Sequence, residues 1–179
     1  MQIRKLEKAD TELVCRWLTA PENSQWFDFG NATPQVQDAR LLLARSSTLA
    51  RVFTADDSGE PIGVVALVAI HSAFKTATLL AALGDKRHER QGHTVQALYE
   101  LMREGFTTLG LNSIHVWIAA PNQYSLRMAR KLGFTKIGTQ RACHVVAGKT
   151  VDRIWFDILP SELRNPRVVT ADSLELGVS

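Results

Sequence analysis

The sequence has little cysteine and no long apolar run, and each absence excludes a class of protein. Its 179 residues contain two cysteines, Cys15 and Cys143, which lie far apart and outside any Cys-x-x-Cys spacing. Such a pair supports neither a disulfide framework nor a zinc site, so we predict no metal. The longest apolar run covers residues 62–70. That is about half of what a membrane span needs, so we predict no membrane partner. The N-terminus has no signal-peptide core, and we expect a cytoplasmic protein.

A strong charge of one sign is also lacking. The formal net charge is +3, which does not require a nucleic-acid partner. A nucleic-acid-binding domain is suggested only by the basic isoelectric point, and no RNP-like or helix-turn-helix signature accompanies it. We therefore predict no nucleic-acid partner. Two basic groups stand out, one around Arg87 and Arg90 and one from Arg127 to Lys131.

The chain alternates between strand-like and helix-like patterns in the order β-α-α-β-β-β-α-β-α-β-β. The predicted strands cover residues 2–6, 50–55, 61–70, 76–83, 114–119, 134–146 and 150–159, and the predicted helices cover 11–18, 33–43, 92–109 and 122–132. This order predicts an α+β fold with a mixed, mostly antiparallel twisted sheet and helices on both faces. The strand–helix–strand unit from Thr76 to Ala119 should hold its strands parallel, with a right-handed crossover. We expect one domain over residues 1–159, followed by an arm or tail over 160–179.

Two segments carry the chemistry. A basic turn ending in Gly92-His93-Thr94 opens a long amphipathic helix, and Asn122-Gln123-Tyr124-Ser125 opens a second helix that closes on Leu132-Gly133-Phe134. A helix start presents unpaired N–H groups and the positive end of the helix dipole, which suits a phosphate. The order of these pieces suggests a cofactor that carries a pyrophosphate and lies between two splayed strands.

With these motifs the sequence resembles the GNAT superfamily of acetyl-CoA-dependent N-acetyltransferases, and within it the RimJ/RimL-type branch. The resemblance covers residues 1–159. It is carried by Trp17-x-x-x-Pro21-Glu22, Glu60-Pro61-Ile62-Gly63, the turn at Gly92, and Asn122-x-x-Ser125 through Lys131-Leu132-Gly133-Phe134. It implies a GNAT-like fold, acetyl-CoA as co-substrate, and direct attack of a primary amine on the thioester in a ternary complex.

The resemblance also implies the residues that hold the cofactor. Backbone groups at Leu83 and Asp85 would pair with the pantetheine arm, and the Leu83 N–H would face the thioester oxygen. Asn122 would hydrogen-bond the same arm while capping its helix. The pyrophosphate would meet the backbone amides from Gln91 to Val95 (Gln91, Gly92, His93, Thr94 and Val95), and the nucleotide phosphates would meet Arg90 and either Arg127 or Arg130. Glu89 would bring a carboxylate close to these phosphates, which requires Arg87 or Arg90 to neutralise it.

The acid and base that are usual in this family are missing. By alignment, the family's tyrosine position holds Ala129 and its glutamate position holds Trp117. Ser125 is the candidate to protonate the leaving thiolate, although it could equally be a second capping hydroxyl. The candidate bases are His115, Asp28 and His71, each with a structural role as the alternative. Trp26, Phe27 and Phe29 are expected to form a wall of the acceptor pocket.

The missing acid and base leave the acceptor and the activity open. A site without a strong base favours an amine of low pKa, so we expect an N-terminal α-amine, an amino sugar or another small amine rather than a polyamine or lysine. The alternative is a non-catalytic GNAT-fold module that binds an acyl-CoA or a partner protein. The arm after Pro160, with Leu174 and Leu176, could dock on a second copy and form a homodimer.

Overall fold

The computed structural model describes residues 1–31, 33–57 and 59–167. Within them the strands are β1 (Ile3–Lys5), β2 (Leu49–Thr54), β3 (Pro61–His71), β4 (Thr76–Leu83), β5 (Ser113–Ala119), β6 (Thr135–Val146) and β7 (Lys149–Ile158). The helices are α1 (Thr11–Thr19), α2 (Pro21–Ser24), α3 (Val36–Ala44), α4 (His93–Thr107) and α5 (Gln123–Leu132), with short 3-10 turns at Lys8–Asp10, Lys86–His88 and Pro160–Glu162. None of these helices is both long and apolar enough to cross a bilayer.

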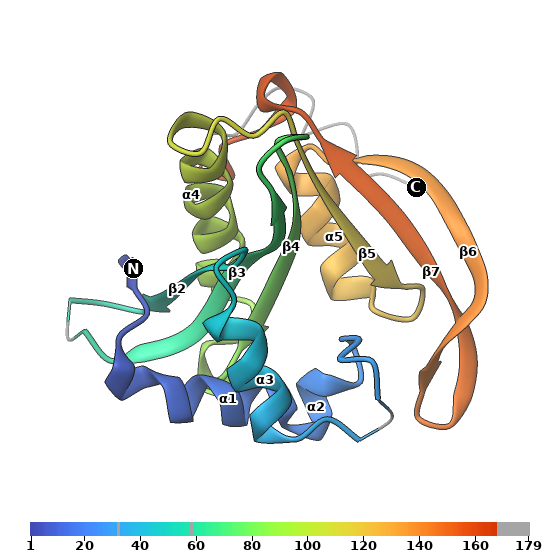
Figure 1. Cartoon of the computed structure of the whole chain (residues 1–179), viewed down its shortest axis with the longest axis horizontal. Helices are drawn as coiled ribbons and strands as arrows, with labels where there is room; N and C mark the ends of the chain where they lie inside the picture. Colours follow the sequence, from blue (N-terminus) through green and yellow to red (C-terminus); the bar gives the residue numbers. More distant parts are fainter. Residues whose placement is uncertain (32, 58, 168–179) are drawn as a thin grey trace.

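The strands form a seven-stranded sheet in the order β1-β2-β3-β4-β5-β7-β6 (Figure 1). Every neighbouring pair is antiparallel except β4 and β5, which are parallel. This confirms the predicted fold class and the predicted parallel pair. β4 and β5 pair only over Thr76–Thr78 and Ser113–His115. Past Thr78, β4 continues beside β3 while β5 continues beside β7, so the two strands part.

Helices cover both faces of the sheet, because consecutive residues of β3 are buried on opposite faces. Val64 packs with α1 and α3 in one buried cluster, and Val65 packs with α4 and α5 in the other. Successive strand residues point to opposite faces, so a nearly continuous apolar strand feeds both cores. The buried clusters thus place α4 and α5 on one face and α1 and α3 on the other, and Figure 1 shows α1, α2 and α3 gathered along the bottom of the view.

Helix α3 begins later than the sequence pattern suggests. The N-cap is Gln35, whose backbone N–H donates to the Asp38 carboxylate at 2.7 Å. A capping box between Gln35 and Asp38 satisfies the first turn, so the helix begins inside the predicted range of 33–43 and not at residue 33. One further element, the short helix α2, lies between the predicted helices 11–18 and 33–43, in a stretch for which no helix was predicted.

The described part of the C-terminal arm packs against the end of α5. The Arg164 N–H donates to the Leu132 carbonyl at 3.0 Å, and Leu163 packs against the α4/α5 core. Leu174 and Leu176 lie outside the described residues, so the expected docking of the arm on a second copy stays a prediction.

Candidate active site

A cavity of about 690 Å³ fills the space where β4 and β5 part. Its walls come from both faces of the sheet. Leu98, Ala129 and Leu132 belong to the α4/α5 face, whereas Phe27 and Leu80 belong to the α1/α3 face. The cavity therefore passes through the plane of the sheet rather than lying on one side of it.

The turn before α4 forms one end of the site. Gly92 adopts φ 82°, in the left-handed region, and the first turn closes with the Gln96 N–H donating to the Gly92 carbonyl. The N–H groups of the first helical residues, His93, Thr94 and Val95, precede that bond and have no partner within the helix. A second hollow of about 320 Å³ adjoins this turn, and Arg90, Arg127 and Lys131 contribute to its walls. Backbone donors and cations thus gather at one end, as an anion requires.

The helical phase of α5 determines which of its basic side chains face the cavities. Arg127 and Lys131 line the hollow beside Gly92, but Arg130 lines neither cavity. Residues 124, 127, 128 and 131 share one helix face, and residue 130 falls on another. The lining of the cavities therefore favours Arg127 over Arg130 at the anion end, and both assignments stay predictions. Sequence reasoning missed Lys131 and Tyr124, which the same spacing could have identified.

Glu89 is balanced by a different cation from those expected. It lines the main cavity, and its carboxylate lies 3.9 Å from the Lys86 ammonium. Arg87 is committed to Asp85, at 2.7 Å, and its guanidinium lowers the pKa of Asp85 to about 2. The Gln91 side-chain oxygen lies 3.1 Å from His93 Nε2, so both side chains bond along the turn.

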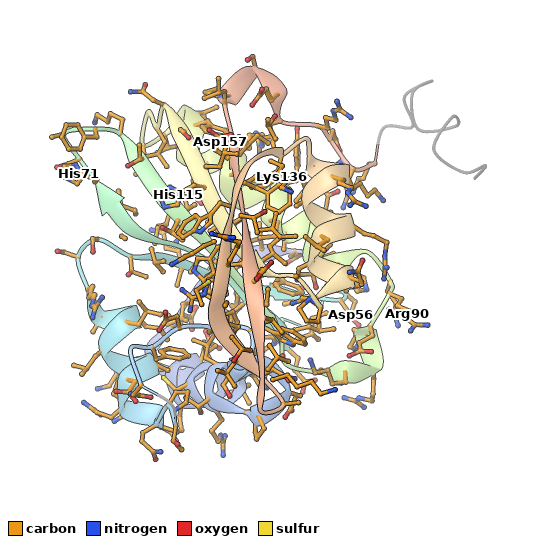
Figure 2. The ribbon with its side chains drawn as sticks, turned by 90° about the vertical axis from the view of Figure 1, so that its right-hand side faces the viewer. Asp56, His71, Arg90, His115, Lys136 and Asp157 are labelled. Atoms are coloured by element: carbon orange, nitrogen blue, oxygen red, sulfur yellow. The ribbon has the colours of Figure 1, made fainter. Side chains whose placement is uncertain are left out.

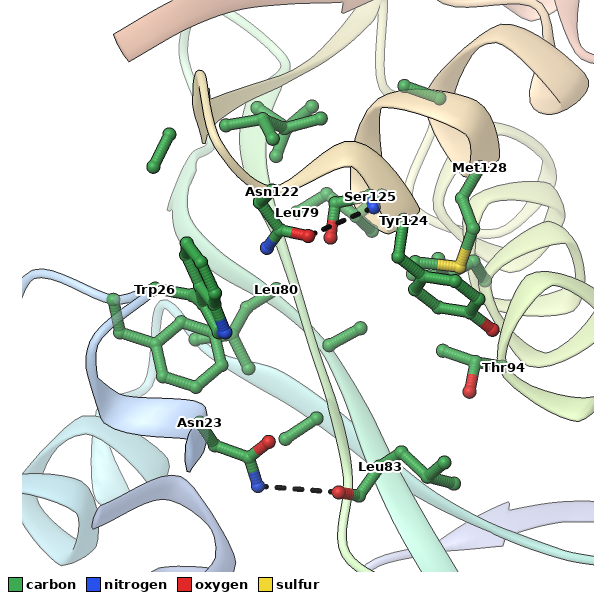
Figure 3. A pocket seen from close by; sticks show the side chains of 18 of the residues that line it. Asn23, Trp26, Leu79, Leu80, Leu83, Thr94, Asn122, Tyr124, Ser125 and Met128 are labelled. Atoms are coloured by element: carbon green, nitrogen blue, oxygen red, sulfur yellow. Dashed lines mark hydrogen bonds between the residues drawn. The ribbon is translucent and has the colours of Figure 1, made fainter. Parts of the chain in front are cut away.

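The backbone of β4 offers hydrogen-bonding groups to the cavity. The Gly84 N–H donates to the Ile62 carbonyl, which makes Gly63 and Leu83 a non-hydrogen-bonded pair in the ladder. The N–H and C=O of Leu83 consequently point away from β3 and toward the gap. The Leu83 carbonyl accepts from the Asn23 side chain at 3.3 Å (Figure 3), whereas the Leu83 N–H has no partner on β3.

The backbone groups of Asp85, unlike those of Leu83, are already hydrogen-bonded within the protein. Its N–H donates to the Ile62 carbonyl at 2.9 Å, and its own carbonyl accepts from the His88 N–H at 3.1 Å. The structure therefore favours Leu83 over Asp85 as the residue that would pair with a bound chain.

Asn122 and Ser125 face the cavity at the start of α5 (Figure 3). The Asn122 side chain accepts from the Ser125 N–H at 3.1 Å, which is an N-cap bond. That bond uses the Asn122 carbonyl oxygen and leaves its amide nitrogen for a ligand. Tyr124 reaches toward Thr94 beside them, and burial raises the pKa of its phenol. Ala129, where the family's tyrosine would stand, is buried in the cavity wall.

The candidate bases occupy three different environments. His115 does not line the cavity, but its Nε2 lies 2.8 Å from the hydroxyl of Thr78, which does. Burial lowers the pKa of His115, which favours the neutral imidazole. Figure 2 shows His115 far from Arg90, so it lies away from the anion end. His71 is exposed and stacks on Phe74 with the ring centres 4.4 Å apart, away from the cavity.

Asp28 lies in the wall of the cavity, near Trp26, Phe27, Phe29 and Trp117. Arg153 and the Gly30 N–H lower the pKa of its carboxyl. A carboxylate with a lowered pKa is a weak proton acceptor. The geometry therefore favours a binding or structural role for Asp28 over that of a base.

The cavity suits a long ligand with an anionic end. Donors and cations surround one end, an unpaired strand edge follows, and aromatic side chains close the far end. Acetyl-CoA has this distribution of groups, since its diphosphate is followed by an amide-bearing arm that ends in the thioester. The residues present therefore fit the co-substrate implied by the resemblance.

Comparisons with known proteins agree with this geometry. Residues 1–135 match the acetyltransferase (GNAT) domain family. The chain is 26% identical over 171 residues to an uncharacterised N-acetyltransferase, p20, of Bacillus licheniformis, covering 90% of this chain and 94% of the relative. A spermidine N-acetyltransferase from Vibrio cholerae, solved with CoA and spermine, superposes with a TM-score of 0.78 at 19% identity, covering 90% of this chain and 96% of that one. A mutant form of the Vibrio cholerae enzyme gives 0.77 at 20% identity, with the same coverage. The match over most of the chain, on a sheet parted at β4 and β5, makes this protein a member of the GNAT acetyltransferase family, whose enzymes use acetyl-CoA.

Proposed function

We propose that the protein transfers the acetyl group of acetyl-CoA to a primary amine of low pKa, such as a protein N-terminal α-amine or an amino sugar. The observation that supports this most directly is the cavity through the sheet, with an anion end at Gly92 and an aromatic end at Trp26 and Trp117. A co-substrate on the α4/α5 face and an acceptor on the α1/α3 face would meet inside it. Membership of an enzyme family favours this function over the non-catalytic module.

In this proposal the backbone of β4 and the side chains of α5 orient the thioester. The Leu83 N–H would donate to the thioester oxygen and stabilise the negative charge that develops there. The Asn122 amide nitrogen would donate to a carbonyl of the pantetheine arm. The amine nitrogen then attacks the thioester carbon, the carbon–sulfur bond breaks, and an amide and a thiolate form.

Two protons must move in this reaction. We assign the removal of the amine proton to His115, acting through the Thr78 hydroxyl with which it shares a hydrogen bond. Ser125, at the start of α5, would return a proton to the thiolate directly or through water. His115 would reach the amine only through the Thr78 hydroxyl. We expect this indirect proton transfer to be inefficient for a strongly basic amine.

The cost of neutralising the amine decides the acceptor class. A lysine-like amine of pKa about 10.4 costs roughly 4.6 kcal/mol to neutralise at pH 7, and an α-amine near 7.8 costs about 1.1 kcal/mol. A site with a weak base cannot offset the larger cost. The Vibrio cholerae relatives are named for spermidine, but a likeness of about 20% identity concerns the fold alone. The acceptor of this chain is therefore argued from its own residues.

A matched pair of peptides tests the proposal. One peptide has a free α-amine and no lysine, and the other has a blocked N-terminus and one lysine. Thiol release on adding each peptide with acetyl-CoA gives kcat/KM. We expect the α-amine peptide to be preferred by about two and a half orders of magnitude, from the difference in neutralisation cost. A preference for lysine or for a polyamine at neutral pH would contradict the proposal.

Three finer assignments belong to the same proposal. The Trp17-x-x-x-Pro21-Glu22 motif supports the RimJ/RimL-type branch. β7 ends at Ile158, close to the proposed boundary at residue 159, but Leu163 and Arg164 still pack against the domain, so the boundary stays a prediction. A homodimer is tested by light scattering on the purified protein.

A further inference from the structure

Arg153 ties together three separate segments of the chain around the acceptor end of the cavity, two of which line it. Its Nη2 donates to Asp28 Oδ2 at 2.7 Å and to His144 Nδ1 at 3.1 Å. Its guanidinium carbon lies 3.9 Å from the centre of the Trp117 ring. These contacts join β7 to the loop after α2, to β6 and to β5. The Arg153 side chain is only 13% exposed, whereas the Asp28 side chain is 44% exposed, so the guanidinium is shielded and the carboxylate still reaches solvent.

The carboxylate of Asp28 is fully engaged by the protein. Its Oδ2 accepts from Arg153, and its Oδ1 accepts from the Gly30 N–H at 2.9 Å. Asp28 also lines the cavity, so its charge would otherwise face a bound acceptor. An ion pair at this distance cancels most of the attraction that the carboxylate would exert on a second cation.

The second hydrogen bond of His144 shows which atom donates in its contact with Arg153. Its Nε2 lies 2.8 Å from the Gln25 carbonyl, which can only accept a hydrogen bond, so Nε2 carries the proton. Its Nδ1 is then the acceptor for Arg153. The imidazole thus holds the guanidinium between the hairpin and the loop from Gln25 to Asp28.

We propose that Arg153 is a specificity-determining residue: by neutralising Asp28 it makes the acceptor end discriminate against amines that carry a second cationic group. This inference rests on the proposed function, since it places the acceptor beside Asp28 and Trp117. Arg153 acts through Asp28 and does not itself line the cavity. Glu22 also lines the cavity and is exposed like Asp28, but it takes no part in the contacts of Arg153.

The test compares 1,4-diaminobutane with butylamine, which share a primary amine and differ in the second charge. The measured quantity is the ratio of kcat/KM for the diamine to that for the monoamine. We expect Arg153→Gln to raise this ratio at least tenfold over wild type, equivalent to about 1.4 kcal/mol. Arg153→Lys keeps the charge and should keep the wild-type ratio. The double variant Asp28→Asn, Arg153→Gln has no carboxylate to expose and should return the ratio to that of wild type.

A ratio for Arg153→Gln within twofold of wild type, or a gain that persists in the double variant, overturns the inference. The affinities of both amines, measured by calorimetry, supply the same ratio if no amine is acetylated, so failure of the proposed function is distinguished from failure of this inference. If Arg153→Gln does not fold, Asp28→Asn serves instead. It leaves Arg153 unpaired and should lower the ratio at least threefold, and an unchanged ratio then counts against the inference.

Discussion

Gly92 and Gly110 form a matched pair for testing the anion end of the site. Both lie in the left-handed region, at φ 82° and 64°, and a Cβ added to either would meet no atom within 4 Å. Alanine at either position therefore carries the same backbone cost, roughly 1–2 kcal/mol for an L-residue in this region. For a domain of this size that lowers Tm by about 2–8 °C. The two substitutions should be nearly equal in stability.

They should differ in binding. Gly92 precedes the unpaired N–H groups of α4, whereas Gly110 follows the end of that helix. Displacing one N–H from a charged phosphate costs about 1.5–3 kcal/mol. We expect Gly92→Ala to weaken acetyl-CoA binding by about 10- to 150-fold and Gly110→Ala to leave it unchanged, as measured by calorimetry. Acetyl-pantetheine lacks the diphosphate and should bind all three proteins equally. Equal affinities of the two variants for acetyl-CoA would refute the assignment of this turn to the diphosphate.

Three further outcomes follow from the geometry. Arg127→Ala should weaken acetyl-CoA binding by about tenfold or more and reduce its dependence on salt, whereas Arg130→Ala should stay within twofold of wild type; calorimetry at two salt concentrations decides this. Gly133→Ala places a Cβ 2.2 Å from a backbone oxygen at φ 99°, so it should lower Tm by at least twice the loss found at Gly110, and an equal loss would count against this packing. Burial lowers the pKa of His115, so below about pH 6.5 the unfolded chain binds more protons than the folded protein. The free energy of unfolding therefore decreases as the pH is lowered. In urea titrations His115→Gln should reduce that fall, and an identical fall would contradict the argument.

Local patterns in the sequence predicted the elements and their order. The turn at Gly92 was predictable because a glycine before a periodic apolar run marks a helix start, and the parallel pair followed from the strand–helix–strand order. The choice between Arg127 and Arg130 was not predictable from composition, since both belong to one basic group. The phase of α5 relative to the cavity decides it, and that phase is set by the packing of Leu126, Ala129 and Leu132.

The contacts that define the acceptor end come from distant parts of the chain. Arg153 and Asp28 are 125 positions apart, and Asn23 and Leu83 are 60 apart. No local periodicity links such residues, because only the folded sheet brings the last hairpin over the loop after α2. The expectation that Asp28 acts as a base failed to anticipate this partner, which changes the chemistry of the carboxylate.

The parting of β4 and β5 has a kinetic consequence. Because the opening reaches both faces of the sheet, a ligand arriving from one side does not block the path of a ligand from the other. Both ligands of the proposed reaction can then occupy the cavity at the same time, so double-reciprocal plots of initial rate should intersect rather than run parallel. Each product can also depart by the route through which its parent came, without waiting for the other to leave.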